Sequence, residues 1–173
     1  MRRMRGICFG RGNKEIAGKI KMNYEKAYME FWEDFGDSKK MVLSTSLNDI
    51  VTSRMMSIVA INEKIYFQTD NTFRKYEQLK GNHNVALCID NIQIEGKCMD
   101  IGHPMAHADF CNAYKKCFTN SYDRYSFLEN ERLFVVTPTF IKKWTYIDGV
   151  PYMETFDIKD KKYLLQQYCG DKK

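Results

Sequence analysis

Short segments rich in β-branched and aromatic residues, separated by tight turns, make up much of the chain between residues 41 and 158. The turns at 62–64, 90–91 and 148–149 each join two such segments, as in β-hairpins. A doubly wound parallel sheet needs a crossover helix after nearly every strand, and these turns are too short for one. We therefore predict a mainly β protein of the α+β kind, an antiparallel barrel with a few flanking helices. The predicted strands are 41–46, 51–61, 65–69, 84–89, 92–99, 132–138, 140–147 and 150–158.

Helices are predicted between and around these strands. Residues 23–36 repeat aromatic side chains at three- and four-residue spacing, as an amphipathic helix does, with Gly36 as its end. A second helix is predicted over 73–80, capped by one of residues 70–72. A third is predicted over 104–119. The segment KKYLLQQY (161–168) is predicted to close the chain with a helical turn or two.

Positive charge is concentrated at the N-terminus. Residues 1–21 contain seven basic residues and one acidic residue, whereas residues 22–173 contain 20 basic and 21 acidic residues. We expect a basic extension over 1–21, disordered or not native, with Met22 as the native start. The folded domain then covers 22–173, and its near-neutral charge argues against nucleic-acid binding.

The cysteine pattern bears on the compartment. Six cysteines are present and none forms a C-x-x-C pair, which disfavours zinc-ribbon and thioredoxin-like sites. Residues 1–21 lack the sustained apolar run of a secretory signal or a membrane span. We therefore expect a cytoplasmic protein with reduced thiols and no membrane association.

Two histidines, His103 and His107, stand four residues apart, which is a spacing that metal sites use on helices. No third ligand follows at a matching spacing, so we interpret the pair as incidental residues at a helix start. Asp109, one turn further on, leaves a metal site as the alternative.

Residues 51–80 could form a phosphate site. A strand carries Arg54, and Arg74 and Lys75 open a helix whose N-terminus adds backbone N–H groups. Arginine offers a fork of donors and lysine a point charge, a combination suited to phosphate. The hydroxyls of Thr69 and Thr72 could complete it. The alternative is an ordinary solvated face, where most Lys and Arg side chains lie.

The stretch SRMMSIVAINEKIYFQTDNTFRKYEQLKGNHNVALCI (53–89), followed by IQIEGKC (92–98), resembles the pyridoxamine 5′-phosphate oxidase-like family of FMN-binding split barrels. The likeness is closest to the short general-stress members of that family and covers roughly residues 25–100. It implies a split barrel that binds FMN, and a homodimer with the flavin site at the subunit interface.

The resemblance also implies roles for individual residues. Three basic residues would bind or lie beside the FMN phosphate, namely Arg54, Lys75 and Arg74. A strand segment would lie along the flavin ring, partly through backbone groups, namely Met55, Met56 and Ser57. Two neighbours on the next strand would border the ribityl chain and the phosphate, namely Gln68 and Thr69.

The sequence departs from the family pattern at several positions. Phe73 replaces a frequent serine, so Thr72 would stand in for its hydroxyl. Asn91 stands where the family's oxidases have glutamine, with a shorter reach to the flavin ring. Trp144 would line the flavin from the second subunit, or alternatively pack within the barrel. No arginine follows Arg132, so the substrate grip of true vitamin B6 oxidases is missing.

These features lead us to expect an FMN-dependent oxidoreductase that takes electrons from a reductant such as NAD(P)H and passes them to a small acceptor. The alternative is a flavin-binding or sensing module without turnover. A third reading is a barrel for another cofactor, such as a deazaflavin or haem.

Overall fold

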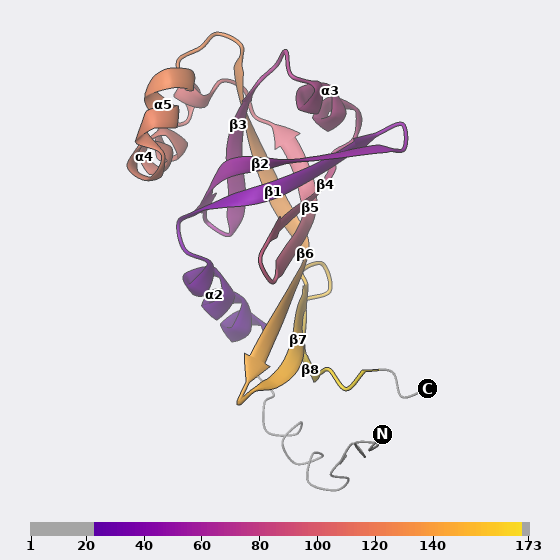
Figure 1. Ribbon diagram of the computed structural model, residues 1–173. Helices are drawn as coiled ribbons and strands as arrows, with labels where there is room; N and C mark the ends of the chain where they lie inside the picture. The colour runs from indigo at the N-terminus through magenta and orange to yellow at the C-terminus, as the bar shows by residue number, and fades with distance from the viewer. Residues whose placement is uncertain (1–22, 171–173) are drawn as a thin grey trace, which may run out of the picture.

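A computed structural model describes residues 23–170 of the protein; the extension expected over 1–21 and its boundary at Met22 lie outside these residues. Eight strands and several short helices follow one another along the chain (Figure 1). The strands are β1 (Ser38–Leu47), β2 (Ile50–Ile61), β3 (Lys64–Asp70), β4 (Asn84–Ile89), β5 (Ile92–Asp100), β6 (Glu131–Ile147), β7 (Val150–Asp157) and β8 (Lys162–Gln167). The helices are α2 (Tyr24–Phe35), α3 (Arg74–Gly81), the 3-10 turn η1 (Pro104–Ala106), α4 (Ala108–Cys117) and α5 (Thr119–Tyr125).

Six of the strands close into an antiparallel barrel, which confirms the predicted fold class. The strand order is β3-β2-β1-β4-β5-β6, and pairing of β3 with β6 closes the ring. β7 and β8 continue the sheet from the far half of β6 as a ribbon that projects below the barrel (Figure 1). β6 therefore contacts three strands: β3 at its start, β5 in the middle and β7 at its end.

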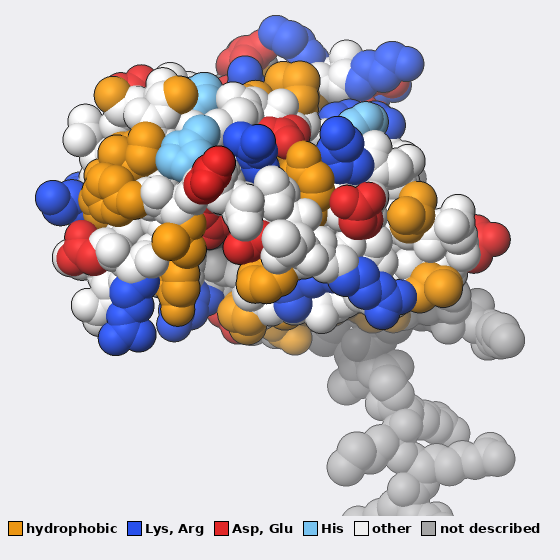
Figure 2. All heavy atoms as spheres, turned by 90° about the horizontal axis from the view of Figure 1, so that it is seen from above, with side chains coloured by type: hydrophobic (Ala, Val, Ile, Leu, Met, Phe, Trp, Pro, Cys, Tyr) orange, Lys and Arg blue, Asp and Glu red, His pale blue; other side chains and the backbone are white. Residues whose placement is uncertain are grey.

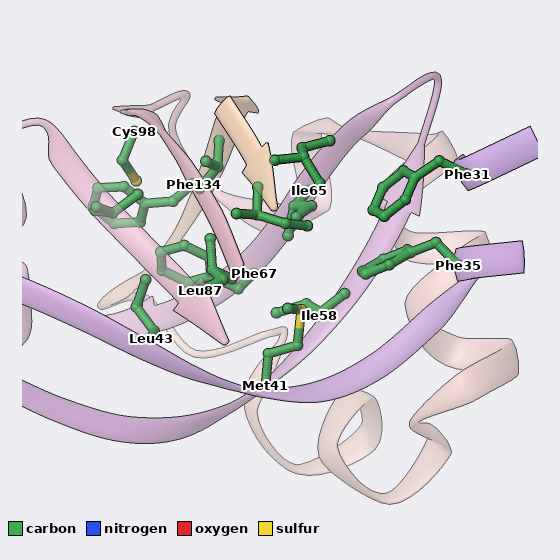
Figure 3. Close-up of a cluster of buried hydrophobic side chains, with 14 of the residues drawn as sticks. Phe31, Phe35, Met41, Leu43, Ile58, Ile65, Phe67, Leu87, Cys98 and Phe134 are labelled. Atoms are coloured by element: carbon green, nitrogen blue, oxygen red, sulfur yellow. The ribbon is translucent and has the colours of Figure 1, made fainter. Parts of the chain in front are cut away.

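The barrel interior is filled by one face of each strand, since successive side chains of a strand point to opposite faces. Met41, Leu43, Ile58, Phe67 and Phe134 are all at most 1% exposed. Figure 3 shows these side chains meeting inside the barrel, with the rings of Phe67 and Phe134 stacked at 5.5 Å.

Helix α2 closes the lower part of the barrel. Its aromatic stripe places Phe31 and Phe35 against the interior side chains, and both are almost fully buried (Figure 3). Phe31 also packs on Phe156 of β7, with ring centroids 5.5 Å apart. The helix ends as predicted at Gly36, whose φ of 72° suits glycine and whose N–H donates to the Trp32 carbonyl.

Helices α4 and α5 lie on the outside of the barrel, to one side of it in Figure 1. Phe110 and Tyr114 of α4 and Tyr122 of α5 form a second apolar cluster with Val59 of β2 and Leu133 of β6. This cluster covers the outer face of β2 at its C-terminal half and leaves the outer face of its first half exposed.

The prediction of a helix over 161–168 is wrong, because Lys162–Gln167 forms strand β8. Every second residue of β8 is more buried than its neighbours, and the strand pairs with β7 from Tyr152 to Asp157. The ring of Tyr163 packs on Phe156 at 5.1 Å. Pairing with the adjacent strand β7 thus overrides the local preference of Lys, Leu and Gln for helix.

Two further boundaries differ from the prediction. The strands predicted over 132–138 and 140–147 are one continuous strand, because Pro138 and Thr139 are accommodated by a bulge opposite Glu95 and Gly96. The helix predicted over 104–119 is divided into η1 and α4, and the following α5 was not predicted. No helix within residues 23–170 is long and apolar enough to cross a membrane.

Candidate functional site

Arg54 lies in the middle of β2, and its guanidinium is enclosed by polar groups. Nη1 donates to the Thr45 hydroxyl at 2.7 Å and to the Leu43 carbonyl at 3.2 Å. Nη2 donates to Oε1 of Gln78 at 3.2 Å and also to the Thr52 hydroxyl. Both hydroxyls donate to the same Gln78 oxygen at 2.7 Å. This network fixes the guanidinium between the β1–β2 hairpin and helix α3.

The start of α3 brings two more cations to this region. Arg74 and Lys75 are its first two residues, and the ammonium of Lys75 lies 4.4 Å from the Phe73 ring centroid. Phe73 is the N-cap residue and provides no side-chain cap, so the predicted capping by one of residues 70–72 is wrong. Asp70 instead accepts hydrogen bonds from the backbone N–H and the hydroxyl of Thr72, both at 2.7 Å. The N–H groups of the first turn thus lack the side-chain cap that most helix starts have.

The charges of these side chains act on one another. Burial, followed by the nearby charge of Arg74, lowers the pKa of Arg54. Burial and then the charge of Arg54 lower the pKa of Lys75, while Glu131 and Asp70 partly offset this effect. Like charges held together in this way favour a bound anion, which would relieve their repulsion. We refer to Arg54, Arg74 and Lys75 as the cation cluster.

A buried polar chain lies beside the cation cluster. Ser126 donates to Oε1 of Gln68 at 2.8 Å, and Nε2 of Gln68 donates to Oε1 of Glu131 at 3.4 Å. Burial, followed by the charge of Asp70, raises the pKa of Glu131 to about 7. Thr69, also buried, donates to the Asp70 carbonyl at 3.4 Å. Gln68 and Thr69 are thus linked to Lys75 through Glu131 and Asp70, and their predicted contact with the ribityl chain and phosphate stays a prediction.

The strand segment predicted to line a flavin ring divides between two faces of β2. Met55 is 59% exposed on the outer face, and alternation places Ser57 on the same face. Met56 instead packs against the barrel core. The structure therefore groups Met55 with Ser57 and separates the side chain of Met56 from them.

Asn91 and Trp144 lie together in a different place. The side-chain amide of Asn91 donates to the backbone carbonyl of Trp144. The backbone N–H of Trp144 in turn donates to the backbone carbonyl of Asn91 at 3.0 Å. Both residues line a groove of about 330 Å³, to which Cys88 and Met153 also contribute. The Trp144 ring contacts Tyr168 at 4.9 Å between centroids.

The register of the sheet separates this groove from the cation cluster. Met55 of β2 is paired with Val42 of β1, Val42 with Cys88 of β4, and Cys88 with Gln93 of β5. Three strand spacings of about 4.8 Å each put roughly 14 Å between the two ends of this row. Within one chain, Asn91 and Trp144 are therefore not brought to the residues that surround Arg54.

Both histidines of the 103–107 segment make local hydrogen bonds. The ring of His103 bonds to the Leu128 carbonyl at 2.9 Å, and its Nδ1 accepts from the Met105 N–H at 3.2 Å. The ring of His107 bonds to the Ile101 carbonyl at 2.8 Å. These contacts hold the start of α4 against the loops beside it.

Residues that sequence reasoning missed complete the site. Thr45 and Gln78 hold Arg54, and Glu131 lies beside Lys75. A glutamine three residues after Lys75 is one turn further along the same helix, and this spacing could have pointed to Gln78. No local pattern indicates the burial of Glu131, which directly follows the polar residues Glu129 and Asn130.

On the face that Figure 2 shows, charged side chains of one sign do not form a continuous patch. Basic side chains are intermixed there with acidic and apolar ones. The cation cluster is thus a local feature of α3 and β2 rather than part of a broad basic surface.

The closed six-stranded barrel with α2, α3 and the outer α4–α5 pair defines the split-barrel fold of pyridoxamine 5′-phosphate oxidase-like proteins. No protein-family model matches the chain, and no curated protein matches its sequence. The solved structures that match it share this fold.

Three solved structures illustrate the likeness. General Stress Protein 26 from Bacillus anthracis is 22% identical, with a TM-score of 0.52 over 69% of this chain and 92% of its own. ChuZ from Campylobacter jejuni is 9% identical, with a TM-score of 0.64 over 91% of this chain and 69% of its own. A pyridoxamine 5′-phosphate oxidase-related, FMN-binding protein from Nostoc punctiforme is 11% identical, with a TM-score of 0.53 over 95% of this chain and all of its own.

Proposed function

We propose that this protein is an FMN-binding oxidoreductase that holds the FMN phosphate at the cation cluster. The observation that carries the proposal is the convergence of Arg54 from β2 with Arg74 and Lys75 from α3. The donor set suits a phosphate, since it combines a guanidinium fork, an ammonium and the open N-terminus of a helix. A split-barrel neighbour described as FMN-binding adds support.

The residues around the cluster would orient the cofactor. Thr45 and Gln78 keep the Arg54 guanidinium in a fixed position before any ligand arrives, which reduces the entropy lost on binding. Met55 follows Arg54 along β2 but, like Ser57, points to the outer face of the strand, and a flat ring placed there would meet the exposed Met55 side chain. Bound FMN supplies the redox chemistry, in which electrons pass from a reductant such as NAD(P)H to a small acceptor such as a quinone or a nitro compound.

We further propose a homodimer. Asn91 and Trp144 lie about three strands away from the cation cluster of their own chain. A second copy, packed on the exposed outer face of β2, would bring its own Asn91 and Trp144 to the flavin ring. Val51 and Met55 on this face are each more than half exposed, as an interface between copies would need.

The compartment we propose is the cytoplasm. The cysteines within residues 23–170 are all free thiols, and two of them, Cys88 and Cys169, are exposed. Exposed free thiols are usual in a reducing compartment. Cell fractionation with an antibody to the protein tests this proposal.

The function is tested by titrating the purified protein with FMN and following the quenching of flavin fluorescence. We expect Lys75→Ala to weaken binding by ~1.5–3 kcal/mol, the range for a charge-assisted contact. Lys80→Ala removes an exposed cation from the same helix and serves as the matched control. Equal affinity of wild type and Lys75→Ala would show that the phosphate is not bound here.

Turnover is tested by adding NAD(P)H to the FMN-loaded protein without oxygen. Bleaching of the flavin absorbance supports the oxidoreductase. Bound FMN that stays oxidised favours the binding or sensing module instead. A Soret band in the purified protein would favour haem, and one neighbour with this fold, HutZ from Vibrio cholerae, is described as a heme storage protein.

A further inference from the structure

Glu131 is a buried carboxylic acid with an unused oxygen. It is the first residue of β6, pairs with Asp70 of β3, and is 6% exposed. Its Oε1 accepts one long hydrogen bond, 3.4 Å, from Gln68, whereas Oε2 has no partner among residues 23–170. Burying a carboxylate oxygen without a hydrogen-bond partner costs folding free energy, so this arrangement calls for an explanation.

The titratable groups that face Glu131 come from three elements. Lys75 of α3 lies close enough to lower the pKa of Glu131, and Asp70 of β3 raises it. Tyr114 of α4 is near enough for the charge of Glu131 to raise the pKa of its hydroxyl. On β6 itself, the nearby backbone N–H of Arg132 also lowers the pKa of the carboxyl. Gln68 and Ser126 are neutral. The charge of Arg54 also lowers the pKa of Lys75, so Lys75 interacts with both the carboxyl and the rest of the cation cluster.

We propose that Glu131 is a proton-linked counterion of the cation cluster, and that it takes up one proton from solvent on Oε2 when a phosphate group binds there. The inference rests on the proposed function and adds a regulation by pH to the same site. No bond other than the O–H of the carboxyl forms or breaks.

The physical reason is competition between two anions for Lys75. In the free protein, ionised Glu131 offsets part of the positive charge of the cluster. A bound phosphate brings further negative charge into the same poorly solvated region, where ionised Glu131 repels it. Binding therefore raises the pKa of the carboxyl, and by reciprocity protonation of the carboxyl strengthens binding. Burial already holds this pKa at about 7, so the coupling acts near neutral pH.

The experiment measures dissociation constants between pH 6 and 8.5 for two probes. FMN is followed by fluorescence quenching. Sulfate is followed by NMR chemical-shift titration, because it stays a dianion across this range whereas the phosphate of FMN titrates near ~6. We expect the Kd of wild type for sulfate to rise about fivefold or more between these pH values, since one pKa unit of coupling corresponds to tenfold.

The matched variants are Glu131→Gln, which keeps the shape of the side chain without its proton, and Glu129→Gln, an exposed position two residues earlier. Glu131→Gln should bind sulfate with a Kd that is nearly independent of pH, and Glu129→Gln should follow wild type. Calorimetry of wild type in two buffers of different ionisation enthalpy provides a measurement without any variant. It should detect uptake of a fraction of a proton per sulfate at pH 7.5.

The outcomes separate the two proposals. If the Kd of Glu131→Gln for sulfate still depends on pH, the proton would be assigned to Lys75 and the role of Glu131 would be overturned. If wild type takes up no proton on binding sulfate, the role of Glu131 would be overturned as well. Both results are compatible with FMN binding. Proton-linked sulfate binding without FMN binding would support the role of Glu131 and remove the proposed function. If neither FMN nor sulfate binds, both the proposed function and the role of Glu131 would be overturned.

Discussion

Gln78 shows how one buried amide can organise a binding site. Its Oε1 accepts from two threonine hydroxyls and from Arg54, although it belongs to a helix whose neighbours Glu77 and Lys80 are exposed. An arginine held by three side chains loses little further freedom when a ligand binds. Gln78 is thus a positioning residue for the cation cluster.

Replacing Gln78 by alanine should destabilise the protein by ~1–3 kcal/mol, because the hydroxyls of Thr45 and Thr52 lose their buried acceptor. FMN binding should weaken as well, since Arg54 would no longer be fixed. Urea denaturation measures the first effect and fluorescence titration the second. Glu77→Ala, one residue earlier and exposed, should change neither quantity.

The stability of the free protein should depend on Glu131. The carboxyl pKa is about 7 in the folded protein and ~4.3 in an unfolded chain. Between these values the folded state binds more protons than the unfolded state, so the free energy of unfolding falls as pH rises from about 4.3 to 7.

Glu131→Gln should therefore flatten the decline in stability between pH 5 and pH 8 by on the order of 2 kcal/mol. Urea denaturation of wild type and variant at both pH values measures the difference. Glu154, whose pKa burial also raises, contributes a decline of the same sign to both proteins and cancels in the comparison. Parallel curves for the two proteins would contradict the assignment.

The candidate site was predictable in part. Arg54, Arg74 and Lys75 could be found because cation type and spacing near a helix start are local properties, read together with a family likeness. The helix spacing could have placed Gln78 near Lys75, but its contacts could not be predicted, since its partners lie 24 to 33 residues away in sequence. Glu131 could not be predicted either, because strand pairing with β3 and the cover of Ser126 decide its burial.

The contact between β5 and β6 depends on Gly96. A Cβ at this position would lie 2.7 Å from the Thr137 carbonyl oxygen and 2.6 Å from Cγ1 of Val136. The register shifts between Glu95 and Gly96. Glycine is therefore needed here for close approach of two backbones.

Gly96→Ala should destabilise the protein by about 1–3 kcal/mol, the usual cost of overpacking. Gly81→Ala is the comparison, because its Cβ would meet only the flexible end of Leu47 and alanine favours helix. Thermal denaturation should show a clear loss for the first variant, and the second should stay within about 1 kcal/mol of wild type.

Strand and helix predictions succeeded where the local pattern and the tertiary environment agree. The aromatic stripe of α2 and its end at Gly36 are examples. The prediction for the segment KKYLLQQY failed because pairing with the open edge of β7 and packing on the Phe156 ring decide its conformation, and neither can be inferred from the helix preference of its own residues. Two strands were predicted over 132–138 and 140–147, yet a bulge at Thr139 joins them into the single strand β6.

The proposed dimer makes a prediction that no single chain can test. Arg54→Ala disables the phosphate side of a site and Trp144→Ala the side contributed by the other copy. Neither homodimer then contains an intact site, whereas each mixed dimer contains one. Coexpression of the two variants should restore about a quarter of the wild-type FMN sites if chains pair at random.

Flavin absorbance of the coexpressed protein measures this recovery, and sedimentation of wild type reports the oligomeric state. A coexpressed sample that binds no more FMN than the two variants separately would mean that both residues act within one chain. Monomeric wild type with tight FMN binding would contradict the dimer itself.

The closure of the barrel by β6 also bears on how the chain can fold as it is synthesised. One edge of β3, residues 64–70, pairs with the preceding β2, but the other edge pairs only with residues 131–136, about sixty residues further along the chain. Contacts of such sequence separation are slow to form, since a long loop must be ordered first. During translation the outer edge of β3 in the β1–β2–β3 meander stays unpaired until β6 has left the ribosome. The N-terminal half of the barrel thus passes through a period in which a second chain can compete for that edge.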